Sequence, residues 1–192
     1  MLDLMVNALR QRPDRIIVGE VRRQREAEIL FEAMHTGHSV YSTVHADNSD
    51  QTISRLTNPP INIPKEMLDA MAGIVVTFRH RRFGLRRVLE FSEVLKNGKL
   101  NTVYSWNVKA DKIRGVNKIN RLTDLLNLYA GLSEKEILDD MKEKSGVLEW
   151  MQKNNYATVN QVGEVVSNYY RDPDAILKAV DKKKNWIFEF GR

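Results

Sequence analysis

Two side chains suited to acid–base chemistry stand just past two short stretches rich in β-branched residues. Glu20 follows the stretch 16–18, and His45 follows the stretch 39–44. If the stretches form neighbouring parallel strands, both side chains reach the carboxyl edge of the sheet, where ligands gather in open parallel sheets. A carboxylate and an imidazole at that edge could orient and deprotonate an attacking water molecule. For any single pair of this kind the alternative is a capping glutamate beside a hydrogen-bonded structural histidine.

A metal site is a second chemistry suggested by the histidines. His35, His38 and His45 follow an H-x2-H-x6-H spacing, with Asp47 close by. A compact zinc site usually places its histidine pair on one helical face or one hairpin. Here Gly37 is expected to end a helix between the first two histidines. We therefore expect no metal site, and we expect His38, which precedes its strand, at the edge opposite Glu20.

The elements that must position these residues follow from local signals. Residues 24–36 have helical periodicity and lie between the two apolar stretches, which predicts a right-handed βαβ unit with parallel strands. The run Ile16-Ile17-Val18 is typical of a strand buried in a parallel sheet. Further along, the stretches 74–78, 87–95 and 100–106 are predicted to be antiparallel strands. The pair Asn97-Gly98 is a strong hairpin signal between the last two.

After about residue 120 the signals are mostly helical. Ser133 with Glu136 forms a capping box for a helix to about residue 153. Thr158 is expected to cap a further helix to 170, and Asp172-Pro173 begins the last helix. The fold class predicted is α/β followed by a helical region. We divide the chain into an α/β part at 1–95, an antiparallel extension at 96–120 and a helical part at 121–192.

Composition narrows the class of protein. The 192 residues include 30 Lys+Arg against 25 Asp+Glu, a net charge of +5, and no cysteine. The lack of cysteine excludes disulfides, iron–sulfur clusters, thiolate zinc sites and cysteine nucleophiles. No apolar run approaches the ~18 residues of a membrane span. We expect a soluble, intracellular globular protein.

A basic loop is the other candidate for function. Its arginines are Arg79, Arg81, Arg82, Arg86 and Arg87, and Phe83 lies among them. An aromatic ring flanked by arginines suits single-stranded nucleic acid, but residues 1–95 are close to neutral overall, which argues against a broad phosphate footprint. A subunit contact or an anionic membrane surface accounts for the same loop, as does an ordinary solvated hairpin tip.

Two long motifs in the first half resemble a known family. Residues 9–22 (LRQRPDRIIVGEVR) resemble the Walker B segment of the type II/type IV secretion ATPases. Residues 33–38 (AMHTGH) with 42–46 (STVHA) are similar to the family's His box. The resemblance covers residues 1 to about 95. It implies part of a RecA-like P-loop NTPase core, and a hexameric protein that powers secretion or the assembly of pili and archaeal flagella from the cytoplasmic face of the membrane.

The resemblance also implies roles for individual residues. Glu20 matches the catalytic glutamate that activates water for attack on the γ-phosphate, and His38 and His45 match the histidines around that phosphate. The strand-end position favours His45 for this role and a structural role for His38. Gly19 stands where other P-loop enzymes keep the Walker B Asp. The family motifs also place Arg22 and Thr43 near the nucleotide, and Arg23 replaces a glycine common in the family.

One motif of the family is absent. No G-x-x-x-x-G-K-[ST] sequence occurs in the chain, so the loop that holds the β- and γ-phosphates is not present. We expect the carboxyl-terminal part of such an ATPase, peripheral to the inner face of the membrane. We expect ATP and Mg²⁺ in the complete enzyme, with negligible binding and hydrolysis by this chain alone. The expected partners are identical subunits in a hexamer and membrane-platform proteins, and nucleic acid is not expected. The alternatives are a non-hydrolysing partner-binding module and a nucleic-acid-binding protein.

Overall fold

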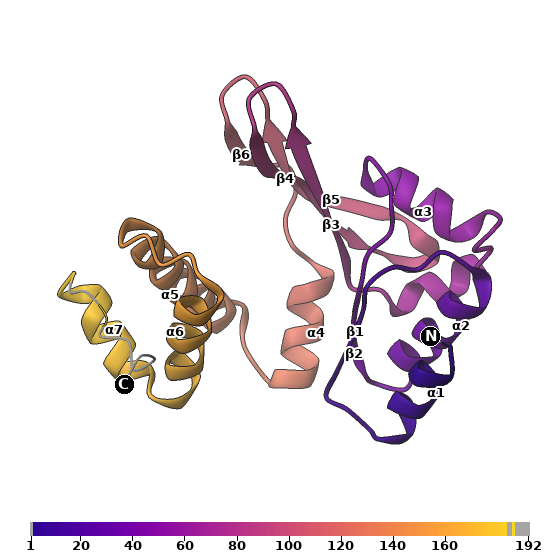
Figure 1. Ribbon diagram of the computed structural model, residues 1–192, viewed down its shortest axis with the longest axis horizontal. Coiled ribbons are helices and arrows are strands. Elements are labelled where there is room, and N and C mark those ends of the chain that lie inside the picture. Colours follow the sequence, from indigo (N-terminus) through magenta and orange to yellow (C-terminus); the bar gives the residue numbers. More distant parts are fainter. Residues whose placement is uncertain (1, 184–185, 187–192) are drawn as a thin grey trace. The chain divides into compact units, whose positions relative to one another are not determined.

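The computed structural model describes residues 2–183 and residue 186 (Figure 1). The chain divides into two compact units, Met1–Asp124 and Leu125–Arg192. The division that we predicted at residues 95 and 120 stays a prediction. Residue 1 of its first part and residues 184–185 and 187–192 of its last part lie outside the described residues.

A strand–helix–strand arrangement forms the start of the first unit. Helix α1 (Leu2–Arg10) leads into strand β1 (Arg15–Val18), and helix α2 (Gln24–His35) connects β1 to strand β2 (Ser39–Ser42). The two strands pair in parallel, with Ile16 opposite Val40 and Val18 opposite Ser42. The predicted parallel βαβ unit is therefore confirmed, although β2 ends two residues earlier than expected.

The two-stranded sheet is covered on one face only. Ile16 and Val18 are buried, and they pack in a core with Leu30 and Phe31 of α2. Ile17, by contrast, is 80% exposed, so the expectation of a strand buried on both faces is wrong for this residue. The reason is that β1 and β2 form a sheet by themselves in the described chain, and only the face with Ile16 and Val18 packs in the helical core.

Short helices extend the core of the first unit. Helix α3 (Ser49–Thr57) begins at Asn48, whose side chain accepts a hydrogen bond from the Gln51 amide, as expected for a cap. A 3-10 helix, η1 (Lys65–Ala70), follows Pro64. The Leu56 and Leu68 side chains from these segments are buried in the same core as α2.

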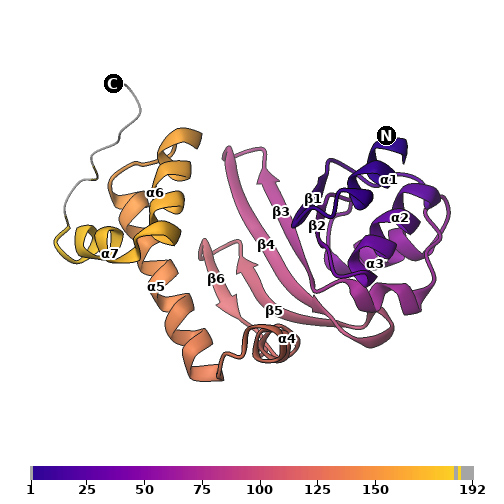
Figure 2. The same ribbon diagram turned by 90° about the horizontal axis from the view of Figure 1, so that it is seen from below.

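An antiparallel sheet makes up the rest of the first unit (Figure 2). Its strands in order are β3 (Gly73–His80), β4 (Leu85–Val94), β5 (Leu100–Asn107) and β6 (Lys112–Gly115). The first three match the strands that we predicted. The turn η2 (Lys96–Gly98) joins β4 to β5. Both Asn97 (φ 57°) and Gly98 (φ 71°) have positive φ, which Asn and Gly adopt most readily and which explains the Asn-Gly signal.

A buried carboxylate ties this sheet to the following helix. Glu93 is fully buried in β4, and helix α4 (Arg121–Ala130) begins beside it. The Glu93 carboxylate accepts hydrogen bonds from the amides of Asn120 (3.1 Å) and Leu122 (2.8 Å) and from the Asn101 side chain (2.7 Å). It therefore supplies acceptors to amides that the first helical turn cannot satisfy.

The second unit is helical, with three further helices: α5 (Glu134–Lys153), α6 (Val159–Arg171) and α7 (Pro173–Asp181). The caps are those predicted, because Ser133 and Thr158 each accept from the amide three residues on. Val147, Trp150, Met151, Val165 and Ile176 form its buried core.

Replacing Glu93 should destabilise the first unit. In Glu93→Gln, a side-chain amide donor faces the amide donors of Asn120 and Leu122, so one buried acceptor is lost. We expect a loss of about 1–3 kcal/mol in the free energy of unfolding, measured by urea denaturation. The control is Glu66→Gln, at an exposed glutamate of η1, which should change stability by less than about 0.5 kcal/mol.

The same carboxylate should make stability depend on acid pH. Burial raises the pKa of Glu93, but the hydrogen bonds from Leu122, Asn120 and Asn101 outweigh it and leave this pKa below its ordinary value. The contribution of Glu93 to the free energy of unfolding is complete above the unfolded-state pKa of about 4.3. It is lost as the pH falls through the lower folded-state value. The stability difference between wild type and Glu93→Gln should therefore shrink below about pH 4. A difference that grew on acidification would contradict this.

Candidate functional site

The loops that follow β1 and β2 are joined at the carboxyl edge of the parallel pair. The Thr43 hydroxyl donates to the carbonyl of Gly19, and the Val21 amide donates to the carbonyl of Thr43 (3.0 Å). Contacts between the two segments therefore continue beyond the last paired residues, Val18 and Ser42. Glu20 lies between the two tied positions, which fixes its backbone relative to the second loop.

Glu20 contacts two cationic or potentially cationic side chains at this edge. Arg22 places Nε 2.7 Å and Nη2 2.6 Å from Oε2 of Glu20, and Nε2 of His45 lies 3.3 Å from Oε1. The Glu20 side chain is 16% exposed, whereas Arg22 and His45 are 71% and 78% exposed. The structure thus brings Glu20 and His45 together, and their catalytic roles stay predictions.

The surroundings favour the ionised form of Glu20. The hydrogen bond from Arg22 lowers the pKa of Glu20, and this effect exceeds the opposing effect of partial burial. The charges of Arg22, His45 and Arg55 lower it further. Arg55, an exposed residue of α3, was not predicted from the sequence. The only indication of its role in the sequence is its place in α3, a helix that begins soon after His45.

The backbone after Glu20 is fixed by the start of α2. Oε2 of Glu26 accepts from the amides of Arg22 (3.1 Å) and Arg23 (3.3 Å). Arg23 has φ −130° and ψ 154°, an extended conformation that any residue adopts. In this structure an arginine therefore fits without strain at the position where the family motif commonly has glycine.

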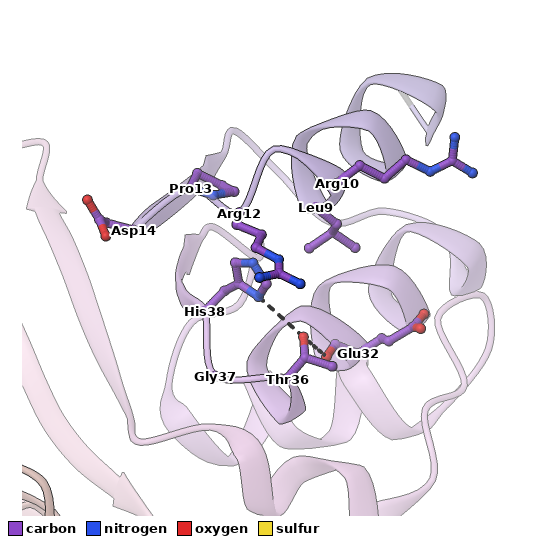
Figure 3. Close-up of a pocket in the computed structure, with 9 residues that line it drawn as sticks. All are labelled: Leu9, Arg10, Arg12, Pro13, Asp14, Glu32, Thr36, Gly37 and His38. Carbon is purple, nitrogen blue, oxygen red and sulfur yellow. Dashed lines mark hydrogen bonds between the residues drawn. The ribbon is translucent and has the colours of Figure 1, made fainter.

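His38 lies at the opposite edge of the parallel pair, as its place before β2 predicts. Its Nδ1 lies 3.3 Å from the carbonyl oxygen of Ala33 and 3.2 Å from Oγ1 of Thr36. His38 lines a hollow of about 690 Å³, which Arg12 also lines (Figure 3). Neither Glu20 nor His45 lines this hollow. The structure therefore separates His38 from the Glu20–His45 pair.

The histidines do not converge on a metal ion. Nδ1 of His35 donates to the carbonyl of Phe31 within α2 (2.7 Å), and His38 and His45 occupy opposite edges. Among residues 2–183 and 186, no group of three or more histidine or acidic side chains is arranged to hold a metal ion.

The basic loop belongs to the hairpin between β3 and β4, not to the parallel pair. Arg79 is paired in register with Arg86, and Phe78 with Arg87. Arg87 forms a two-pronged ion pair with Asp111, at 2.7 Å and 2.6 Å. Arg81 and Arg82 occupy the turn, where the Arg82 guanidinium lies 5.6 Å from the centre of the Phe83 ring. No described hydrogen bond or ion pair links these residues to Glu20.

Comparison with known proteins identifies a family for the first part of the chain. Residues 1–81 match the family model described as type II/IV secretion system protein. This range contains Glu20, His38 and His45.

Relatives are found among archaeal and bacterial proteins. An uncharacterised protein of Methanocaldococcus jannaschii is 36% identical over 156 residues, which are 77% of this chain and 57% of that protein. The type IV pilus assembly ATPase PilB of Pseudomonas aeruginosa is 39% identical over 74 residues, 38% of this chain and 13% of that protein. PilB of Acinetobacter baylyi is 52% identical over 50 residues, which are 26% of this chain and 9% of that protein. The chain thus spans little more than half the length of the first relative and far less of the others.

Removing Arg22 should raise the pKa of Glu20. The variant Arg22→Ala loses the hydrogen bond that most lowers this pKa, so protonation should begin at a higher pH. The measurement is an NMR titration of the Glu20 side-chain carboxyl carbon. Arg23→Ala is the matched control, because Arg23 contacts Glu20 through no described side-chain bond. Equal titration curves for Arg22→Ala and wild type would contradict the assignment.

Proposed function

We propose that the chain is the carboxyl-terminal part of an ATPase that powers protein secretion or the assembly of pili or flagella, since residues 1–81 are a partial domain of the type II/IV secretion system protein family. In this proposal ATP hydrolysis takes place at the carboxyl edge of β1 and β2. The core would be RecA-like, with the matched region containing the Walker B and His-box motifs.

The observation that carries the proposal is the contact between Glu20 and His45. Oε1 of Glu20 lies 3.3 Å from Nε2 of His45, and the lowered pKa of Glu20 keeps its carboxylate ionised at neutral pH. An ionised carboxylate with one oxygen beside an imidazole and the other beside a guanidinium can hold a water molecule in a fixed orientation. This is the requirement for in-line attack on a phosphoryl group.

Each residue of the edge has a distinct task in this proposal. Glu20 orients the water and accepts its proton, and His45 donates a hydrogen bond on the phosphate side. Arg22 stabilises the charge of Glu20 and must release Oε2 as the water enters, because it occupies that oxygen. Gly19 and Thr43 hold the two loops together, and His38 fixes the start of β2 from the opposite edge.

The residues present fit one side of a nucleotide. Bound ATP with Mg²⁺ would supply the γ-phosphate as the electrophile for the oriented water. Glu20, His45 and Arg22 suit the water side of that phosphate, but the sequence contains no P-loop lysine or hydroxyl to hold the β- and γ-phosphates. We therefore propose that the 192 residues by themselves bind ATP weakly and hydrolyse it negligibly.

The wider setting is part of the proposal. The complete protein would act as a hexamer with secretion or pilus membrane-platform proteins, at the inner face of the cell membrane. Within the described residues, no helix is both long and apolar enough to span a membrane. A non-hydrolysing module that binds partner subunits is the second candidate, and the lack of a P-loop motif in the chain favours it.

The test joins the chain downstream of the P-loop segment of a pilus assembly ATPase and measures phosphate release from ATP. Glu20→Gln in this fusion should lower kcat by at least about 100-fold, because the proton acceptor is lost. ATP affinity should change little. The control Glu66→Gln, in the exposed part of η1, should keep the rate of the unaltered fusion.

Two results would contradict the proposal. One is a Glu20→Gln fusion that keeps its turnover, which would leave the partner-binding module as the better description. The other concerns the 192-residue chain alone: hydrolysis at a rate close to that of an intact relative would overturn the proposed need for a P-loop.

A further inference from the structure

The free ends of two hairpins concentrate the positive charge of the first unit. We call residues 79–87, the adjoining ends of β3 and β4 with their turn, and residues 107–114, the adjoining ends of β5 and β6 with their turn, the basic tips. They contain eight basic residues and one acidic residue, an excess of +7, whereas the whole chain carries only +5. The basic residues are Arg79, Arg81, Arg82, Arg86, Arg87, Lys109, Lys112 and Arg114. Outside these tips the chain is therefore slightly acidic.

The two tips form one connected surface. Arg87 of the first is held by Asp111 of the second through two short hydrogen bonds, and the Trp106 indole also donates to Asp111 (3.0 Å). The rings of Phe78 and Trp106 pack with centroids 5.8 Å apart. Figure 1 shows both hairpins projecting from the sheet in the same direction. Because Asp111 is occupied by Arg87, it does not neutralise the other cations.

The other arginines of the basic tips repel one another, and this repulsion disfavours the folded hairpins. Arg79 and Arg86 are register partners on neighbouring antiparallel strands, and like charges directly opposite each other are destabilising. Among the described residues, Arg79, Arg81, Arg82 and Arg86 have no acidic ion-pair partner. A polyanionic surface would offset this repulsion.

Apolar side chains at the same tips indicate which polyanion fits. Phe83 is 63% exposed between Arg82 and Gly84, and Val108 and Ile113 of the other hairpin are 55% and 56% exposed. Of the three, only Phe83 offers the aromatic ring on which the bases of a single strand stack, and Val108 and Ile113 do not. They do gain from entering the boundary between lipid headgroups and acyl chains, while arginine and lysine extend to the phosphates.

We propose that the basic tips bind directly to the anionic headgroups of a lipid membrane surface, with Phe83, Val108 and Ile113 entering the interface. This inference goes beyond the proposed ATPase function and is independent of Glu20 and of nucleotide. It assigns a lipid contact to the β3–β6 sheet itself, without requiring a membrane-spanning helix or a platform protein.

The test is co-sedimentation of the 192-residue chain with phosphatidylcholine vesicles prepared with and without phosphatidylglycerol. Binding should require phosphatidylglycerol and should weaken as salt screens the charges. Arg81→Ser with Arg82→Ser should weaken binding about 25-fold, since each cation near an anionic surface contributes about fivefold. The matched control is Lys96→Ser with Lys99→Ser, at the β4–β5 turn, which should weaken binding less than about threefold.

The apolar contribution is tested separately with Phe83→Ser, which changes no charge. This variant should bind about tenfold more weakly, and the deficit should persist at high salt. Circular dichroism confirms that each variant is folded. Equal binding to neutral and anionic vesicles, or equal effects of the tip and control double variants, would overturn the proposal. So would tighter binding to a single-stranded oligonucleotide than to the vesicles, which would mark the surface as a nucleic-acid site.

Discussion

The candidate site depends on one constraint, the parallel pairing of β1 with β2 in a single register. With Val18 opposite Ser42, the chain leaves both strands at the same edge, and the Thr43 contacts to Gly19 and Val21 hold the two exits together. A shift by one residue would turn Ile16 and Val18 out of the core, so burial fixes the register that positions Glu20 beside His45. The same pairing sends His38 to the opposite edge. The separation of the two histidines is therefore a consequence of strand direction.

The electrostatics of this edge create a balance between orientation and basicity. The hydrogen bond from Arg22 that orients Glu20 also lowers its pKa, and a carboxylate with a lowered pKa is a weaker base. In return the Glu20 carboxylate has a fixed orientation, because Arg22 contacts Oε2 and leaves Oε1 beside His45. Arg22 is mostly exposed, so it can leave Glu20 without disturbing the core. The Arg22–Glu20 contact therefore fixes the orientation of the carboxylate without being part of the core.

Local signals predicted most elements, and distant contacts explain what was missed. The caps Ser133 and Thr158 and the Asn97-Gly98 turn were correct because each acts within four residues. Strand β6 was missed because its four residues are all exposed and show no alternation of apolar side chains. The capping of α4 by Glu93 and the Arg87–Asp111 pair join residues 24–29 positions apart, which leaves no periodic signal. For the site, chain order predicted that Glu20 and His45 share an edge, but not the contributions of Arg22 and Arg55 to the Glu20 pKa.

The antiparallel sheet holds a fully hydrogen-bonded buried charge at one end and, among the described residues, unpaired like charges at the other. Near the core, β4 buries the carboxylate of Glu93, and donors from Asn101, Asn120 and Leu122 offset the cost of removing it from water. At the far end of the same strand, Arg86 and Arg79 face each other without an acidic partner among the described residues. The first arrangement is complete within the chain and serves stability. The second leaves a repulsion between like charges that no described acidic side chain offsets and that a bound anion would reduce.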